Sequence, residues 1–386
     1  LLQEARAGRY PSTDPSAGAT YGRPSAALAV GAPAGWTLAA GFAASYQVDI
    51  FGRIRRSIQS ANANVQATAA AEDVVRVSVA AAVASAYANI CGFGEQIDVA
   101  RRSETLLART YDIDVRQRAA GALSDFDIAR QAVLLDQARA AIPPLEGQRR
   151  STLFALAALT GLTPAEVPAA AAACRRPPTL RQLLPVGDGA GLLRRRPDIR
   201  EAERTLAANT YRIGVAAADL YPTVSLGGSV SSAAPALGQL FSPSTTSYGV
   251  GPLISWSFPN IAVARAHVRE TTAQAASAEA SFQATMLQAL QETEQALATY
   301  AAELEHHRQL ASASAAAGTA LRLALLQYRA GVASGLDLIT AQSAAVGADQ
   351  ALAASDQALS ADQVAVFQAL GGGWEDAPAV AVPTIR

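Results

Sequence analysis

The three histidines, His267, His306 and His307, are the side chains best suited to metal binding or acid–base catalysis. His306 and His307 are adjacent, so on a helix they point to different faces and cannot share a metal ion. We therefore predict that both are solvated surface residues. The sequence contains no nucleophile–base pair, glycine-rich phosphate loop or metal-ligand spacing. It predicts a protein that is not an enzyme, with no catalytic residue, metal site or cofactor.

Two other groups of residues could take part in chemistry but have simpler explanations. Cys91 and Cys174 are too few for a disulfide framework or a zinc knuckle, and Cys91 is expected to be a small packing residue in a helix. The run 194–198, Arg-Arg-Arg-Pro-Asp, could bind an anion. We favour a helix start, because Pro is accepted in the first turn and acidic residues suit the positive end of the helix dipole.

A repeated turn contains the most informative carboxylates. Gly121 and Gly331 fit the left-handed stop position of a helix. Three residues beyond each glycine is a serine, and three further is Asp127 or Asp337, which is the pattern of a capping box. One interpretation is that both aspartates only cap helices. The other is that symmetric copies of these carboxylates and of Tyr328 meet around an axis and constrict a pore.

Long helices must position these turns. Prolines are absent from residues 34–142 and 260–377, the intervals in which long helices can form. Apolar side chains recur every seven residues there, which indicates helix-on-helix packing; the series are Ile58, Val65, Val79, Ala86, Phe93, Ala100 and Leu107, with Glu72 as the polar break, and Leu290, Leu297, Leu304, Ala311, Gly318 and Leu325. We predict helices over 52–117 and 262–327, each about 100 Å long, and a break of the returning helix at Pro143-Pro144.

The chain contains two copies of one unit. Tyr10-Pro11 matches Tyr221-Pro222, and Gly121 to Asp127 matches Gly331 to Asp337, at offsets close to 210 residues. Phe42, Tyr46 and Ile50 match Val250, Ile254 and Phe258, and Ala158-Leu159 matches Ala369-Leu370, at similar offsets. Four separate landmarks thus share nearly one offset, which indicates a tandem duplication.

Each copy opens with alternating apolar and small or polar residues, which predicts strands. Examples are Phe42, Tyr46 and Ile50 in the first copy and Tyr248, Val250 and Trp256 in the second. Two hairpins give four strands, too few to close a barrel, since closed barrels have about eight or more. We therefore expect several chains to complete one membrane barrel with apolar residues toward lipid. A soluble sandwich with the apolar face in a core is the alternative.

Composition excludes other classes of protein. The formal net charge is −1, from 31 basic and 32 acidic residues, which argues against a nucleic-acid binder. The uncharged stretch 77–94 is too weakly apolar to predict a transmembrane helix. The chain begins at Leu1 without a Met, so we interpret it as a mature or trimmed fragment; a preceding export signal or lipid-bearing cysteine would not be visible.

Several stretches, in this order, resemble the TolC-like outer-membrane efflux channels, especially the often lipid-anchored branch that includes nodulation protein T; they are 48–53, 193–203, 213–222, 328–337 and 369–374. The resemblance implies a mainly α-helical homotrimer with a twelve-stranded barrel in outer-membrane lipid and a long periplasmic α-barrel. It also implies two partners, a periplasmic adaptor and an inner-membrane pump of the proton-driven resistance-nodulation-division type. By the same resemblance, part of the first helix and any anchor are missing here.

The resemblance also assigns site residues. It implies a pore gate at Asp337, Tyr328, Asp127, Leu336 and Ile339, and adaptor-binding tips at Gly121, Ala122, Leu123, Ser124, Gly331, Val332, Ala333 and Ser334. Some family members carry Arg at the position of Ala333 and Asp at that of Thr340. The closed state here is therefore expected to use fewer salt bridges, or apolar contacts of Leu336 and Ile339.

Together these observations predict seven segments: barrel hairpins at 9–51 and 219–259, helical hairpins at 52–162 and 260–370, a helix at 193–218, and equatorial segments at 163–192 and 371–386. The predicted function is a passive channel of a tripartite efflux system in the Gram-negative outer membrane, extending into the periplasm. Two alternatives stay open, a soluble coiled-coil rod and a stand-alone diffusion porin.

Overall fold

The computed structural model describes residues 2–23, 33–178, 194–256 and 261–371. Contacts divide the chain into two units. Leu1–Ala71 and Asp198–Thr285 form the first, and Glu72–Pro197 and Met286–Arg386 the second. Each unit is therefore assembled from both halves of the sequence.

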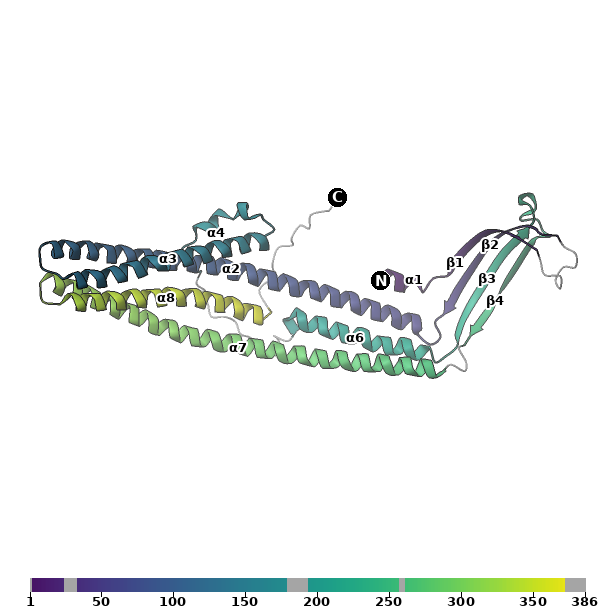
Figure 1. The fold of residues 1–386 in the computed structure, drawn as a ribbon. Coiled ribbons are helices and arrows are strands. Elements are labelled where there is room, and N and C mark those ends of the chain that lie inside the picture. The colour runs from purple at the N-terminus through teal and green to yellow at the C-terminus, as the bar shows by residue number, and fades with distance from the viewer. Residues whose placement is uncertain (1, 24–32, 179–193, 257–260, 372–386) are drawn as a thin grey trace. The chain divides into compact units, whose positions relative to one another are not determined.

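The first unit contains a four-stranded antiparallel sheet in the order β1-β2-β3-β4 (Figure 1). The strands are β1 (Ser12–Gly22), β2 (Gly35–Val48), β3 (Thr223–Ala234) and β4 (Thr246–Ser255). The 3-10 helix η2 (Leu237–Gln239) lies between β3 and β4. Two predicted hairpins are thus confirmed, and β2 pairs with β3 to join them.

The strand register separates the sheet into an apolar and a polar face. Val230 lies opposite Phe42 on one side and Tyr248 on the other, so these side chains share a face. Ser229 belongs to the opposite face, where it pairs with Gly249. The apolar face is open to its surroundings: Tyr248 is 88% exposed and Val250 is 81% exposed. The soluble-sandwich alternative fails for the described residues, because no second layer covers this face.

Helices of the first unit pack through small side chains. They are α1 (Leu2–Ala7), α6 (Pro197–Ala218) and the first parts of α2 (Arg53–Ala119) and α7 (Ile261–Arg329). Ala208 and Ala216 of α6 are buried, and the Ser60 hydroxyl of α2 donates to the Ala208 carbonyl at 3.0 Å. Short side chains allow this close helix approach. Pro197 opens α6, which confirms the predicted helix start.

The second unit contains two helical hairpins, α2 with α3 (Asp125–Leu159) and α7 with α8 (Gly335–Ala369) (Figure 1). Two short helices follow α3: η1 (Pro164–Glu166) and α4 (Ala169–Ala173). α2 and α7 have 67 and 69 residues, and α3 and α8 have 35 each. These matched lengths confirm the duplication.

The equatorial segments are only partly described. Residues 163–178 of the first equatorial segment contain η1 and α4. Residues 179–193 and 372–386 lie outside the described residues.

The predicted break at Pro143-Pro144 is wrong. α3 continues through both prolines to Leu159. The prolines remove two backbone donors, but side chains on the next turns hold the helix against its neighbours. Glu146 pairs with Arg101 of α2 at 2.7 Å, and Arg149 donates to the Ile90 carbonyl at 3.4 Å. Tertiary contacts thus outweigh the local proline penalty.

The prediction that Cys91 is a simple packing residue is also wrong. Cys91 in α2 forms a disulfide with Cys174, which directly follows α4. Arg149 of α3 donates to the Cys174 carbonyl at 3.0 Å. At Gly94 a Cβ atom would lie 2.6 Å from that same carbonyl oxygen, so only glycine fits there. The sequence could not predict the pair because 83 residues separate the two cysteines.

The seven-residue series are only partly buried. Ala86, Ala100 and Leu107 are buried as predicted, whereas Val65 and Val79 are 46% and 41% exposed. In the second series Leu290 and Leu304 are also exposed within one chain. The apolar spacing therefore continues onto faces that this chain does not cover.

The prediction that both adjacent histidines are solvated is wrong for His307. Its Nε2 lies 2.7 Å from an oxygen of Asp356 in α8. His306 is exposed and contacts only Glu303, one turn earlier on α7. α8 packs against one side of α7, so one of the two neighbours gains a partner.

One described helix passes the length and composition test for a membrane span. α2 contains an 18-residue stretch of mean hydropathy 1.6, of which 22% is buried. From the sequence, the stretch 77–94 is interpreted as too weakly apolar for a span, whereas α2 reaches the required length and apolar composition. A single helix of this kind is weak evidence for a span, because helices of soluble proteins pass the same test. α2 also carries Gln96, whose amide bonds Gln357 of α8 at 2.5 Å.

We predict that replacing both cysteines (Cys91→Ser with Cys174→Ser) lowers the thermal unfolding temperature of the second unit. Closing a loop of this length removes about 4 kcal/mol of chain entropy from the unfolded state. Thermal unfolding followed by circular dichroism should show the loss, and a reductant should produce it in the wild-type protein. The reductant should leave the double variant unaffected. Equal melting of oxidised and reduced wild-type protein would contradict this prediction.

Candidate functional site at the helix tips

The two turns that end α2 and α7 have the same backbone geometry. Gly121 and Gly331 adopt φ angles of 76° and 73°, in the left-handed region that favours glycine. The residue after each glycine donates its N–H to a carbonyl five positions earlier, Ala122 to Gln117 and Val332 to Gln327, both at 2.9 Å. These bonds satisfy helix-end carbonyls and confirm the predicted helix stops.

Both predicted capping boxes are present. The Ser124 side chain accepts from the Asp127 N–H and the Asp127 carboxylate accepts from the Ser124 N–H; Ser334 and Asp337 repeat this pattern. The serine hydroxyls also donate to the carboxylates, at 2.6 Å in the first turn and 2.7 Å in the second. These hydrogen bonds favour the charged carboxylates and hold the pKa of Asp127 and of Asp337 below its ordinary value.

The side chains that fasten the two turns differ. In the first turn Arg118 forms an ion pair with Asp125 at 2.5 Å, which links the two helices of one hairpin. The duplicated positions, 210 residues later, are Tyr328 and Gly335. The second hairpin therefore lacks this ion pair, and its aromatic side chain is available for another contact.

Tyr328 links the end of α7 to the end of α2. Its hydroxyl lies 2.8 Å from Oε1 of Gln117 and 3.2 Å from Oδ1 of Asp114. Burial and the neighbouring Asp114 carboxylate raise the pKa of Tyr328 to about 12, so the hydroxyl keeps its proton and acts as donor. Burial also raises the pKa of Asp114. One phenol thus joins the two hairpins of a single chain.

A buried pair of amides lies further along the same helices. Gln131 of α3 and Gln342 of α8 lie at closely similar places in the two copies, offset by 211 residues, and both are fully buried. The Gln131 amide donates to Gln342 at 3.4 Å, and Gln342 donates to the Thr110 hydroxyl of α2 at 2.7 Å. The side-chain oxygen of Gln131 has no partner among the described residues. These polar contacts are a second link between the hairpins.

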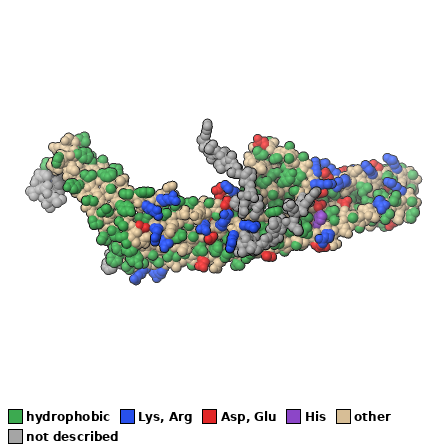
Figure 2. All heavy atoms as spheres, turned by 180° about the vertical axis from the view of Figure 1, so that it is seen from behind, with side chains coloured by type: hydrophobic (Ala, Val, Ile, Leu, Met, Phe, Trp, Pro, Cys, Tyr) green, Lys and Arg blue, Asp and Glu red, His purple; other side chains and the backbone are tan. Residues whose placement is uncertain are grey.

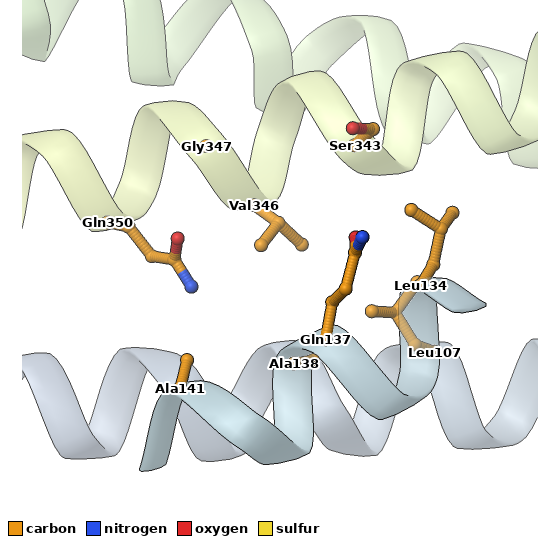
Figure 3. Close-up of a pocket in the computed structure, with 9 residues that line it drawn as sticks. All are labelled: Leu107, Leu134, Gln137, Ala138, Ala141, Ser343, Val346, Gly347 and Gln350. Carbon is orange, nitrogen blue, oxygen red and sulfur yellow. The ribbon is translucent and has the colours of Figure 1, made fainter. Parts of the chain in front are cut away.

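A groove of about 230 Å³ lies between α8 and the pair α2 and α3. Figure 3 shows Leu107, Leu134 and Val346 on its apolar wall, while Gln137 and Gln350 extend from opposite helices into the space. The lining holds no acid, base or thiol, so it offers no catalytic chemistry.

The structure separates the predicted gate residues into two groups. Asp127 lies near Tyr328 and Asp114, since its charge contributes to raising both pKa values. Asp337 and Leu336 lie in the first turn of α8 and are exposed, and Ile339 is half-buried. In the second turn Val332 is 77% exposed. The remaining predicted tip residues are exposed or half-buried; they are Gly121, Ala122, Leu123, Ser124, Gly331, Ala333 and Ser334.

The structure can now be compared with known proteins. The family described as "Outer membrane efflux protein" matches residues 2–162 and 191–372. The chain belongs to this family. Nodulation protein T of Rhizobium leguminosarum bv. viciae is 32% identical over 352 residues, covering 88% of this chain and 70% of that protein. Outer membrane protein OprJ of Pseudomonas aeruginosa is 28% identical over 339 residues, covering 87% and 70%.

A solved structure described as the outer-membrane channel OprN agrees in fold. It has a TM-score of 0.89 and 31% identity, and the match covers 97% of this chain and 84% of that one. The fold is therefore TolC-like. The protein is an outer-membrane channel of a Gram-negative efflux pump, and the transport it supports is not enzymatic.

Sequence reasoning missed four residues of this efflux channel that the fold brings into contact. Asp114 and Gln117 face Tyr328, and Gln131 faces Gln342. A polar residue in the middle of a largely apolar helix face is the one signal that could have indicated Gln131 and Gln342. Arg196 was also missed as a tertiary contact: it is buried, pairs with Glu292 at 2.6 Å and donates to the Ala369 carbonyl at 3.0 Å.

We predict that Ser334→Ala raises the pKa of Asp337 toward its ordinary value, because the variant loses the hydroxyl bond that favours the carboxylate. Since the folded pKa is lowered, the cap stabilises α8 at pH above the ordinary value and loses this effect as pH falls through the lowered one. Carbon-detected NMR titration of labelled aspartate measures the pKa of Asp337 in the wild type and in the variant. Ser343→Ala, on an exposed part of the same helix, is the control, and an unchanged Asp337 titration in Ser334→Ala would contradict the prediction.

Proposed function

We propose that three copies of this chain form a passive conduit through the outer membrane, closed at rest by the helix tips. The observation that carries this proposal is the open sheet with an exposed apolar face. Strands β1 and β4 are edges in a single chain, and unpaired backbone groups are not tolerated in lipid. Two chains would give an eight-stranded barrel, whose interior is filled by side chains. Three chains would give a twelve-stranded barrel, which leaves a lumen.

The two faces of the sheet support this arrangement. Tyr248, Val250 and Ile254 lie on the apolar face and suit lipid, whereas Ser225, Ser229 and Gly251 line the opposite face and suit a water-filled lumen. Exposed apolar residues of the long helices, such as Val65 and Leu304, are then expected to pack against neighbouring copies.

The gate is proposed to lie at the tips. Symmetric copies of Asp337 approach the axis in the closed state, with Leu336 and Ile339 beside them. Tyr328 holds each second hairpin against the first through its contacts with Asp114 and Gln117, and Asp127 lies beside them as part of the proposed gate. Opening is an outward splaying of the tip helices that breaks these contacts. Thr340 carries a hydroxyl and no carboxylate, and it donates this hydroxyl to the Leu336 carbonyl of its own helix.

The partners are proposed to be a periplasmic adaptor, which grips the turns 121–124 and 331–334, and an inner-membrane pump of the resistance-nodulation-division type. Relatives that are pump components support this over a stand-alone porin; one is the toluene efflux pump outer membrane protein TtgC of Pseudomonas putida, 27% identical over 337 residues. Crosslinking from Ser124 or Ser334 to an adaptor tests the partner.

We predict that the detergent-solubilised protein is a trimer by native mass spectrometry and that Val250→Arg prevents its assembly in vesicles. An arginine on the lipid face costs about 2–4 kcal/mol near the bilayer centre. Ser229→Arg is the matched control on the other face; it should assemble and change only the ion selectivity of the channel. A monomer that is monodisperse without detergent would contradict the proposal.

We predict that Asp337→Ala combined with Tyr328→Phe raises single-channel conductance in planar bilayers, because both the axial carboxylates and the link from α7 to α2 are lost. The matched control is Asp349→Ala with Tyr300→Phe, the same changes on the same two helices but outside the tips. Conductance equal to that of the wild type would place the gate elsewhere.

A further inference from the structure

The four strands end together at the place where the helices begin. β1 starts at Ser12 and β2 ends at Val48, while β3 starts at Thr223 and β4 ends at Ser255. The register pairs these ends with one another across the sheet. The strands contain 10 to 14 residues. A transmembrane strand needs about 9–11, so this end of the sheet lies at a membrane surface if the sheet spans the bilayer.

Aromatic side chains gather at this end. Tyr10 is 72% exposed, and the Phe51 ring stacks on Tyr221 with centroids 4.6 Å apart. Trp256 follows β4 directly and is half exposed. Amphipathic rings are enriched at the level of lipid headgroups, which places the residues immediately beyond them at the depth of the phosphates.

Exposed arginines occupy that position. Arg9 precedes β1, Arg55 lies in the first turn of α2, and Arg265 and Arg269 lie in the first turns of α7; these four residues are called the arginine collar. A Cβ atom on Gly8 would lie 3.6 Å from Ile54, so the chain before β1 runs close to the start of α2. Figure 2 shows basic side chains over the helices beside the hydrophobic end of the sheet.

The positive charge of the arginine collar is not neutralised by neighbouring carboxylates. Within the described residues its four guanidinium groups form no ion pair. The nearest carboxylates already have partners: Asp49 accepts from the N–H groups of Ile54 and Arg55, and Asp219 pairs with Arg53. The opposite end of the sheet differs, because residues 33–34 and 235–245 contain no charge and Arg23 is the one charged residue described there.

We propose that the arginine collar binds the phosphate groups of anionic phospholipids in the leaflet that faces the periplasm, and so sets the depth of the channel in the membrane. The inference rests on the proposed function, since it requires the sheet to span the bilayer. To the proposed channel function it adds anionic phospholipid as a ligand and the arginine collar as the surface that binds it. The chain contains no lysine, so every basic side chain of the collar is a guanidinium that can donate two parallel hydrogen bonds to one phosphate.

The test measures lipid preference of the assembled channel in vesicles of phosphatidylethanolamine with and without phosphatidylglycerol. Spin-labelled versions of both lipids report the relative association constant at the protein surface. We expect the wild type to prefer phosphatidylglycerol and the variant Arg9→Gln, Arg55→Gln, Arg265→Gln, Arg269→Gln to lose that preference, by about fivefold for each arginine that contacts the headgroups. The corresponding four-lysine variant should keep most of the preference and shows that the fold tolerates the changes.

The matched control replaces four exposed arginines of the other unit, Arg102, Arg109, Arg150 and Arg322, with glutamine and should keep the wild-type preference. An equal preference in the collar variant and the wild type would overturn the inference. A free-phosphate site would also overturn it, and would appear as saturable binding of inorganic phosphate with unchanged lipid preference. If the collar faced the lumen, the four-glutamine variant would change the ion selectivity of the channel and leave its lipid preference unchanged, and this result would also overturn the inference. Failure of the wild type to form trimers or enter vesicles would instead refute the proposed function itself.

Discussion

Backbone hydrogen bonding in the sheet is the constraint on which the rest of this protein depends. Every N–H and C=O group in a hydrocarbon layer must be paired, and a four-stranded sheet leaves two edges unpaired. The exposed aromatic face prevents the sheet from being a water-soluble layer, and its open edges prevent it from being a membrane element alone. The proposed assembly with further copies would meet both conditions and would give the apolar faces of the long helices a partner.

Close packing of small side chains is the second physical theme. Alanine dominates the buried positions, and two glycines of α2 mark the points of closest approach. A Cβ at Gly92 would lie 2.5 Å from Gln357 of α8, and one at Gly94 would meet the Cys174 carbonyl. α2 is therefore held from two directions within a few residues, by an amide network on one side and by a disulfide-linked segment on the other. Such packing makes this part of the second unit rigid.

Duplication has conserved backbone geometry while the cross-links have diverged. Both tips use the same glycine stop and the same capping box, but Arg118 binds within its own hairpin and Tyr328 reaches the other hairpin. The two turns therefore share a backbone geometry, while the side chains that link them to the rest of the protein differ. Gln131 and Gln342, which lie at closely similar places in the two copies, bond each other, and Gln342 also bonds Thr110.

The amino-acid sequence alone determined the features that depend on local rules. Proline-free intervals, alternation, glycine stops and capping boxes act over a few residues, so the helices, strands and turns at 121–127 and 331–337 could be predicted from them. The residues that the fold brings together over long separations could not. Cys91 meets Cys174, His307 meets Asp356, and α3 continues through Pro143 because neighbouring helices hold it. Only the tertiary structure decided these contacts, since their energy comes from partners that no local pattern encodes.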